Sequence, residues 1–95
     1  MFDCCIWDIK DLKGNKVLVD LEINDEIGIV DNYDLELDLT KMGLTQKDDF
    51  AMTLNKDITR FINGYYNENK KIPTSDEIKN KMEVNWNETK MWLAV

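Results

Sequence analysis

Apolar and polar residues alternate along most of the first 44 residues of the chain. A period of two is typical of β-strands that bury one face, because successive side chains point to opposite sides of the sheet. The alternating stretches are residues 5–10, 17–23, 27–30 and 33–39, and polar residues separate them. We therefore predict three or four antiparallel strands that share one apolar face.

The phase of the alternation assigns side chains to the two faces of this sheet. The apolar set is, strand by strand, Cys5, Trp7 and Ile9, then Val17, Val19, Leu21 and Ile23, then Tyr33, Leu35, Leu37 and Leu39. Gly14 lies between the first two strands, where a tight turn needs a positive φ. The opposite face of the last strand is acidic.

From Thr45 onward, apolar residues recur every three and four positions, which is typical of an amphipathic helix. The apolar stripe consists of Phe50, Leu54, Ile58, Phe61, Ile62 and Tyr65. Thr45 with Asp48 indicates where this helix starts. Gly64 or residues 67–69 indicate where it ends.

A second helix is predicted to open at a capping box, in which Thr74 caps the first turn and Glu77 reaches back to it. Ile78 and Met82 form its short apolar side. A turn near residues 83–85 is expected to follow.

The last ten residues, 86–95, fit a third helix, and their aromatic spacing also fits a final strand. With the helical alternative, the predicted fold class is α+β in a single domain. An N-terminal antiparallel sheet of three or four strands (1–44) precedes a three-helix, helix-turn-helix-like C-terminal half (45–95).

The stretch PTSDEI, residues 73–78, resembles the start of the second helix in the helix-turn-helix of LexA-type and other winged-helix repressors. The similarity extends over residues 57–95. Two positions depart from the family pattern, which has a small residue where this chain has Lys79 and glycine where it has Glu83. The resemblance implies a recognition helix that offers a DNA or docking surface, made of Asn87, Thr89, Lys90 and Trp92.

The net charge is confined to the predicted sheet. Residues 1–44 hold four lysines against eleven acids, a balance of −7, whereas residues 45–95 hold eight cations and eight acids. The polar face of the sheet carries Asp20, Glu22, Asp34, Glu36 and Asp38. Alternate residues of a strand lie about 6.6 Å apart, so these acids are expected at about the separation of successive DNA phosphates.

Two interpretations of this acidic face are open. It is either a solvated outer surface that keeps the sheet from aggregating, or a mimic of nucleic-acid phosphates that occupies a basic groove on another protein.

Several function classes are disfavoured by what the sequence lacks. It has no histidine, no glycine-rich phosphate loop and no nucleophile motif, so we expect no enzymatic activity and no cofactor. Cys4 and Cys5 are adjacent and have no histidine to complete a metal site. The chain shows no signal-peptide pattern and no apolar run of about 18 residues. We expect a protein of the bacterial cytoplasm without membrane contact.

Two functions agree with these observations. The first is a non-enzymatic inhibitor or adaptor whose acidic face blocks a basic nucleic-acid-binding protein. In size and acidity the chain is similar to small phage anti-defence proteins, including anti-CRISPR inhibitors, which implies a CRISPR effector as one such target. The second is a small helix-turn-helix regulator that binds DNA directly, as a homodimer. The absence of a basic stripe favours the first.

Overall fold

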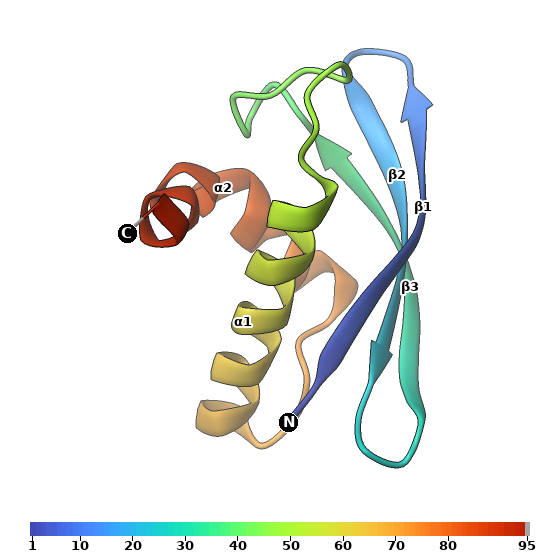
Figure 1. The fold of residues 1–95 in the computed structure, drawn as a ribbon, viewed down its shortest axis with the longest axis vertical. Coiled ribbons are helices and arrows are strands. Elements are labelled where there is room, and N and C mark those ends of the chain that lie inside the picture. Colours follow the sequence, from blue (N-terminus) through green and yellow to red (C-terminus); the bar gives the residue numbers. More distant parts are fainter. Residues whose placement is uncertain (95) are drawn as a thin grey trace.

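Three strands and two helices form two layers (Figure 1). The computed structural model describes the backbone of residues 1–94 and the side chains of residues 1–85. Strands β1 (Asp3–Leu12), β2 (Lys16–Asn24) and β3 (Ile29–Asp38) make one antiparallel sheet in the order β1-β2-β3. Helices α1 (Ala51–Asn69) and α2 (Ser75–Ala94) both lie against one face of that sheet. The other face is left open.

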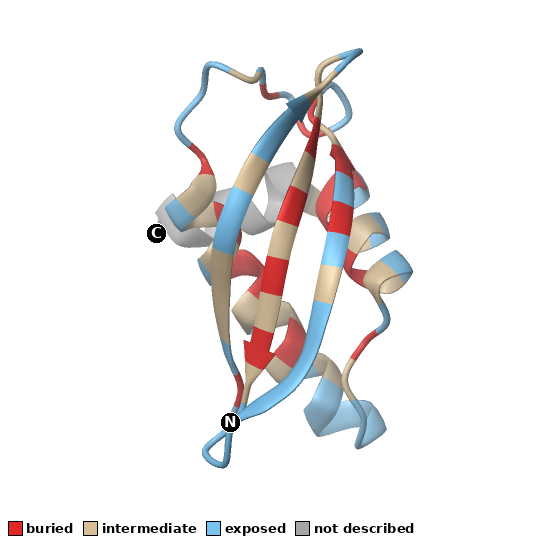
Figure 2. Cartoon of the chain, turned by 90° about the vertical axis from the view of Figure 1, so that its right-hand side faces the viewer, coloured by how far each residue is buried: buried red, intermediate tan, exposed pale blue. Residues whose placement is uncertain are grey.

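The core lies between the two layers, and the central strand contributes every second residue to it. Figure 2 looks onto the open face, where β2 alternates between buried and half-buried residues. The predicted phase of this strand is confirmed, because its four apolar residues are all 0% exposed: Val17, Val19, Leu21 and Ile23. The helices cover them with Leu54, Ile58, Ile62, Ile78 and Met82.

The predicted phase of the first strand is wrong up to Trp7, because β1 contains a bulge, and it is confirmed beyond the bulge, where Ile9 packs against the core. Between Ile6 and Asp8 the strand advances two residues while β2 advances one, so Trp7 is an extra residue. A bulge reverses the alternation beyond it. Ile6 and Ile9 therefore both pack against the core, while Trp7 is 64% exposed.

The predicted stretches 27–30 and 33–39 belong largely to one strand, β3, so the sheet has three strands. A second irregularity lies near its start, where Ile23 pairs with Asp31 and Asn24 pairs with Ile29. Val30 is the extra residue there.

Helix α1 begins later than predicted. Thr45 and Asp48 form a separate turn, in which the Thr45 amide donates to the Asp48 carboxylate at 2.7 Å, and the helix starts only at Ala51. Gly64 lies inside the helix and does not end it. The helix ends at Asn69, within the alternative predicted range, and Lys70 adopts a left-handed conformation with φ 60°.

The predicted capping box of α2 is confirmed. The Thr74 amide donates to Glu77 Oε1 at 3.0 Å, and the Glu77 amide donates to Thr74 Oγ1 at 3.2 Å. These bonds satisfy two amides at the start of α2 that have no partner within the helix.

The prediction of three helices is wrong, because α2 continues to Ala94. Within the described backbone of α2, the non-helical residue is Asn85, with φ −115° and ψ 17°. The chain bends at this residue and is helical again beyond it. Glu83, expected in the predicted turn, is instead helical and bound to the sheet. Residues 86–94 are accordingly helix and not strand.

The loop between β3 and α1 folds over the β1–β2 turn and is bound to it by Asn15. This residue has φ 57°, next to Gly14 at φ 81°, as the predicted tight turn requires. Its side-chain amide donates to the Leu44 carbonyl at 2.9 Å, and its Oδ1 accepts the Gln46 amide at 3.2 Å.

Asparagine side chains of α1 bind backbone groups at the outer edge of β1. Asn63 pairs with both the amide and the carbonyl of Phe2, at 2.8 and 3.0 Å. Two turns earlier, Asn55 donates to the Cys4 carbonyl at 3.1 Å. Because β2 lies on the inner side of β1, these contacts cover the first residues of its free edge.

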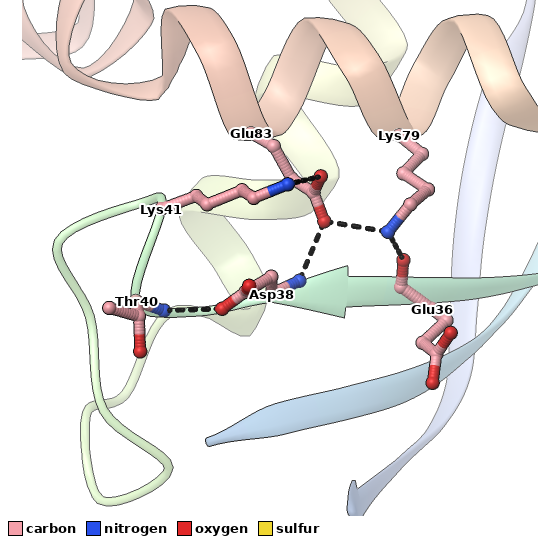
Figure 3. A network of polar contacts seen from close by, with 6 residues as sticks. All are labelled: Glu36, Asp38, Thr40, Lys41, Lys79 and Glu83. Carbon is pink, nitrogen blue, oxygen red and sulfur yellow. Dashed lines mark hydrogen bonds and ion pairs between the residues drawn. The ribbon is translucent and has the colours of Figure 1, made fainter. Parts of the chain in front are cut away.

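A buried glutamate of α2, Glu83, binds the backbone at the end of β3 (Figure 3). Glu83 Oε2 accepts the Asp38 amide at 2.7 Å and Lys79 Nζ at 2.7 Å, and Lys79 also donates to the Glu36 carbonyl at 2.7 Å. Lys41 lies 3.7 Å from the other oxygen. Burial alone would raise the pKa of Glu83, but the Lys79 and Asp38 hydrogen bonds and the two lysine charges together lower it.

Lys79 and Glu83 are also the two positions that depart from the repressor pattern. Both side chains are used to attach α2 to the sheet.

Candidate functional site: the open face of the sheet

The register of the strands gathers acidic residues on the open face. Asp8 pairs with Asp20, and Asp20 pairs with Asp34, so three aspartates form one row across all three strands. Directly opposite residues in antiparallel strands have Cα atoms about 4.5–5.5 Å apart. The row therefore places three carboxylates within a short distance at the centre of the sheet.

The other predicted acids lie in neighbouring rows of the same face. Glu22 is opposite Asn32, on one side of the aspartate row, and Glu36 is opposite Leu18 on the other side. Asp38 is opposite Lys16 in the next row. The structure thus brings all five predicted acids together, and we call the set with Asp8 added the acidic face: Asp8, Asp20, Glu22, Asp34, Glu36 and Asp38.

None of the ion pairs among the described side chains involves the acidic face. The carboxylates in those pairs belong to Glu26 and Glu83. Like charges directly opposite one another destabilise a sheet, so the central row opposes folding unless solvent, salt or a partner screens it.

Neutral donors bind some of these acids without cancelling their charge. The Trp7 indole donates to Glu22 Oε2 at 3.1 Å, and the Asn24 amide group donates to Glu22 Oε1 at 3.0 Å. Asn32 donates to Asp20 Oδ1 at 3.3 Å. These contacts orient the carboxylates of Glu22 and Asp20.

Two members of this surface were missed by the sequence analysis. Strict alternation placed Trp7 with the buried residues. It placed Asp8 on the polar face, but the predicted acidic set did not include it. The bulge brings both to the open face, where both are exposed. The signal was present in the spacing of Ile6 and Ile9, because two apolar residues three apart in a strand indicate an extra residue between them.

The open face is not uniformly acidic. Lys10 lies opposite Leu18, and Lys16 lies opposite Leu12 and Asp38, so both cations are near the β1–β2 turn. Glu36 and Asp38 therefore share rows with these lysines, whereas the aspartate row and the row of Glu22 contain no cation. Trp7 lies beside those two rows.

The second predicted surface lies outside the described side chains. Asn87, Thr89, Lys90 and Trp92 fall in the last part of α2, where only the backbone is described. Their predicted role in contacting DNA or a docking partner stays a prediction.

Comparison of the chain with protein-family models, with curated proteins and with solved structures finds no match. Among the described residues, no group of three acidic or cysteine side chains is arranged to hold a metal ion. In the same part of the chain, neither helix has the length and apolar character needed to cross a bilayer.

Proposed function

We propose that the protein is a non-enzymatic inhibitor or adaptor that binds a basic nucleic-acid-binding protein through its acidic face. The observation that supports this most directly is the row Asp8–Asp20–Asp34, which lacks a described counter-ion at the centre of an open sheet face. Such a row weakens the free protein, and a partner that supplies cations would remove that penalty.

The mechanism follows from what a nucleic-acid groove recognises. Lysine and arginine side chains that contact successive phosphates are spaced for a regular array of negative charges. The acidic face offers carboxylates in two dimensions, about 5 Å apart across strands and about 6.6 Å apart along them. Opposite charge would also accelerate the encounter of the two proteins.

Trp7 gives this surface an apolar contact beside its charges. Tryptophan is enriched among the residues that dominate binding energy at interfaces. Trp7 is 64% exposed and adjoins Glu22, so a partner can bury it while pairing with the acids. A bacterial CRISPR effector in the cytoplasm has a groove of the required kind, as do other basic nucleic-acid-binding proteins.

The test uses two double variants with equal loss of charge. Asp20→Asn with Asp34→Asn neutralises the central row, whereas Asp49→Asn with Asp76→Asn neutralises two exposed acids elsewhere. Immobilised protein is used to isolate a partner that short duplex DNA displaces, and the purified partner is assayed for DNA binding. The wild type and the Asp49/Asp76 variant should block that DNA binding equally, and the Asp20/Asp34 variant should be at least tenfold weaker.

Equal inhibition by both variants would contradict the proposal, because net charge alone would then suffice. Direct binding is tested separately by fluorescence anisotropy of labelled duplex DNA at low salt, which favours phosphate contacts. Saturable binding to DNA itself would instead support the regulator implied by the repressor resemblance.

A further inference from the structure

A cavity of about 370 Å³ lies between the two helices, in the layer that covers the other face of the sheet. Its walls include Asp57, Phe61, Gly64 and Tyr65 of α1 and Lys81 and Met82 of α2. The four α1 residues follow the helical spacing of four, three and one, so they form one stripe along the helix. Most of the lining is carbon, and one buried carboxylate belongs to it.

Asp57 is the unusual member of this lining. Its side chain is 1% exposed, and within the described part of the chain neither carboxylate oxygen has a hydrogen-bond partner. Buried polar groups in native proteins nearly always have partners, and a buried charge without one is strongly unfavourable. Arg60 lowers the pKa of Asp57 by its charge, but burial dominates and raises it to about 6. The carboxylate is therefore mostly ionised at neutral pH.

Gly64 is the second unusual member. It lies in the middle of α1, its backbone is helical, and a Cβ at this position would meet no atom within 4 Å beyond the adjacent residues and the local helix backbone. Neither backbone conformation nor close packing requires glycine here. Glycine in a helix interior is less stable than alanine by roughly 0.5–1 kcal/mol. Because Gly64 has no side chain, the cavity is wider at this position.

Aromatic rings form the wall nearest to Gly64. Phe61 and Tyr65 meet edge to face with centroids 5.8 Å apart. The Tyr65 hydroxyl donates to Glu77 at 2.5 Å, which fixes the ring in place. Lys81 Nζ lies 5.9 Å from the centroid of the Phe61 ring, so this wall already attracts an ammonium group.

We propose that the cavity binds a small organic cation, with its ammonium group paired to Asp57 and its apolar body against Phe61, Tyr65 and Met82. The ligand supplies the donors that Asp57 lacks and an apolar body for the carbon-rich walls. This site lies across the sheet from the acidic face and is independent of the function proposed above.

The charges around the cavity allow this ligand. Arg60 and Glu68 of α1 and Lys81 of α2 also line it, and two cations thus face two acids. Arg60 and Glu68 are exposed, so water and salt screen them. Asp57 is buried and unscreened, so its charge dominates the interior of the cavity.

The experiment is an NMR titration of uniformly ¹⁵N-labelled protein with benzylammonium as the probe and benzyl alcohol as its neutral analogue. At pH 7.5 the amides of Phe61, Gly64 and Tyr65 should shift saturably with benzylammonium. Benzyl alcohol should bind at least tenfold more weakly. Asp57→Asn should weaken benzylammonium at least tenfold and leave benzyl alcohol unchanged, while Asp49→Asn should change neither.

A second variant tests the cavity without altering charge. Gly64→Leu fills the open wall and should abolish the shifts caused by both probes, while its own spectrum stays dispersed. Equal affinity for the two probes, or benzylammonium binding that survives Asp57→Asn, would overturn the assignment. Shifts confined to the acidic face would do so as well, because they would show that benzylammonium binds surface carboxylates instead.

Discussion

At the residue scale, two buried carboxylates in the helical layer have opposite surroundings. Glu83 accepts hydrogen bonds from Lys79 and from the Asp38 amide, and its pKa is lowered. Asp57 has no described partner, and its pKa is raised. The same functional group therefore stabilises the fold at one position and destabilises it at the other.

Replacing Glu83 should destabilise the protein strongly. Glu83→Ala leaves the Asp38 amide without its acceptor and leaves Lys79, which is 37% exposed, with the Glu36 carbonyl alone. Leaving a buried donor unsatisfied costs about 1–3 kcal/mol. Urea unfolding at pH 7 measures the loss. Glu36→Ala is the control, because Lys79 binds the backbone carbonyl of Glu36 and not its exposed side chain. The control should change stability by less than about 0.5 kcal/mol, and a similar loss for both variants would contradict the role of Glu83.

The pH dependence of the Glu83 contribution follows from the sign of its shift. A carboxyl group whose pKa is lower in the folded state binds protons less well there. Its stabilisation is therefore complete above the ordinary pKa of 4.5 and is lost as the pH falls through the lower folded value.

Asp57 should show the opposite dependence. Its pKa rises from 3.8 to about 6 on folding, so the ionised form destabilises the fold above pH 6, and this effect disappears below pH 4. Asp57→Asn should be more stable than the wild type at pH 7.5 by roughly 3 kcal/mol, with the charges of Arg60, Glu68 and Lys81 left in place. Urea unfolding at pH 7.5, 6 and 4.5 should show the difference shrinking at each step. A difference that is constant with pH would contradict the burial of an ionised carboxylate.

At the element scale, β2 could be predicted residue by residue and β1 could not. The central strand is paired on both sides, so its alternation is uninterrupted. β1 is an edge strand, and its free side allows an extra residue at Trp7. Strict alternation through that residue assigns Ile6 and Trp7 to the wrong faces. The α2 helix was mispredicted for another reason. The turn expected near residues 83–85 is reduced to one non-helical residue, Asn85, and the chain is helical again beyond it.

The bulge yields a prediction about deletion. Without Trp7, β1 would pair regularly with β2, with Ile6 and Ile9 still facing the core. Deletion of Trp7 should therefore preserve cooperative unfolding, measured by circular dichroism during heating. Deletion of Cys5 is the control, because it shifts Phe2 and Cys4 by one residue and moves their side chains to the opposite face. Loss of folding on deletion of Trp7 would mean that the bulge itself is required for the sheet.

At the scale of the whole molecule, charge is segregated by layer. The acids of the open face follow from the sequence, because alternation and composition agree there. The cavity at Asp57 could not be predicted, since its walls come from two helices whose relative position no local pattern specifies. Phe61 and Tyr65 were assigned to the apolar stripe of α1, and only the placement of α2 shows that they border a cavity.

Salt should stabilise the protein through its acidic face. Repulsion within the aspartate row is screened as ionic strength rises, since the Debye length falls from about 30 Å at 0.01 M to about 3 Å at 1 M. The melting temperature of the wild type should rise over this range of NaCl. The Asp20→Asn/Asp34→Asn variant should melt higher at low salt and gain less from salt. The Asp49→Asn/Asp76→Asn variant should respond like the wild type, and an equal response of all three proteins would rule out repulsion in this row.

The contacts at the sheet edges have a further consequence for how this protein can associate. Side chains of α1 occupy the start of the β1 edge and those of α2 occupy the end of the β3 edge. The remaining part of each edge contains a bulge, at Trp7 in β1 and at Val30 in β3. Neither edge of the sheet therefore offers a straight row of unpaired backbone groups along its whole length to the strand of another protein. The covered ends and the bulges disfavour both the addition of a partner's strand to this sheet and edge-to-edge joining of chains of the protein into a fibril. Recognition then depends on side chains, so a partner must complement the side chains of the open face or of the helical layer, and an extended backbone alone is not enough.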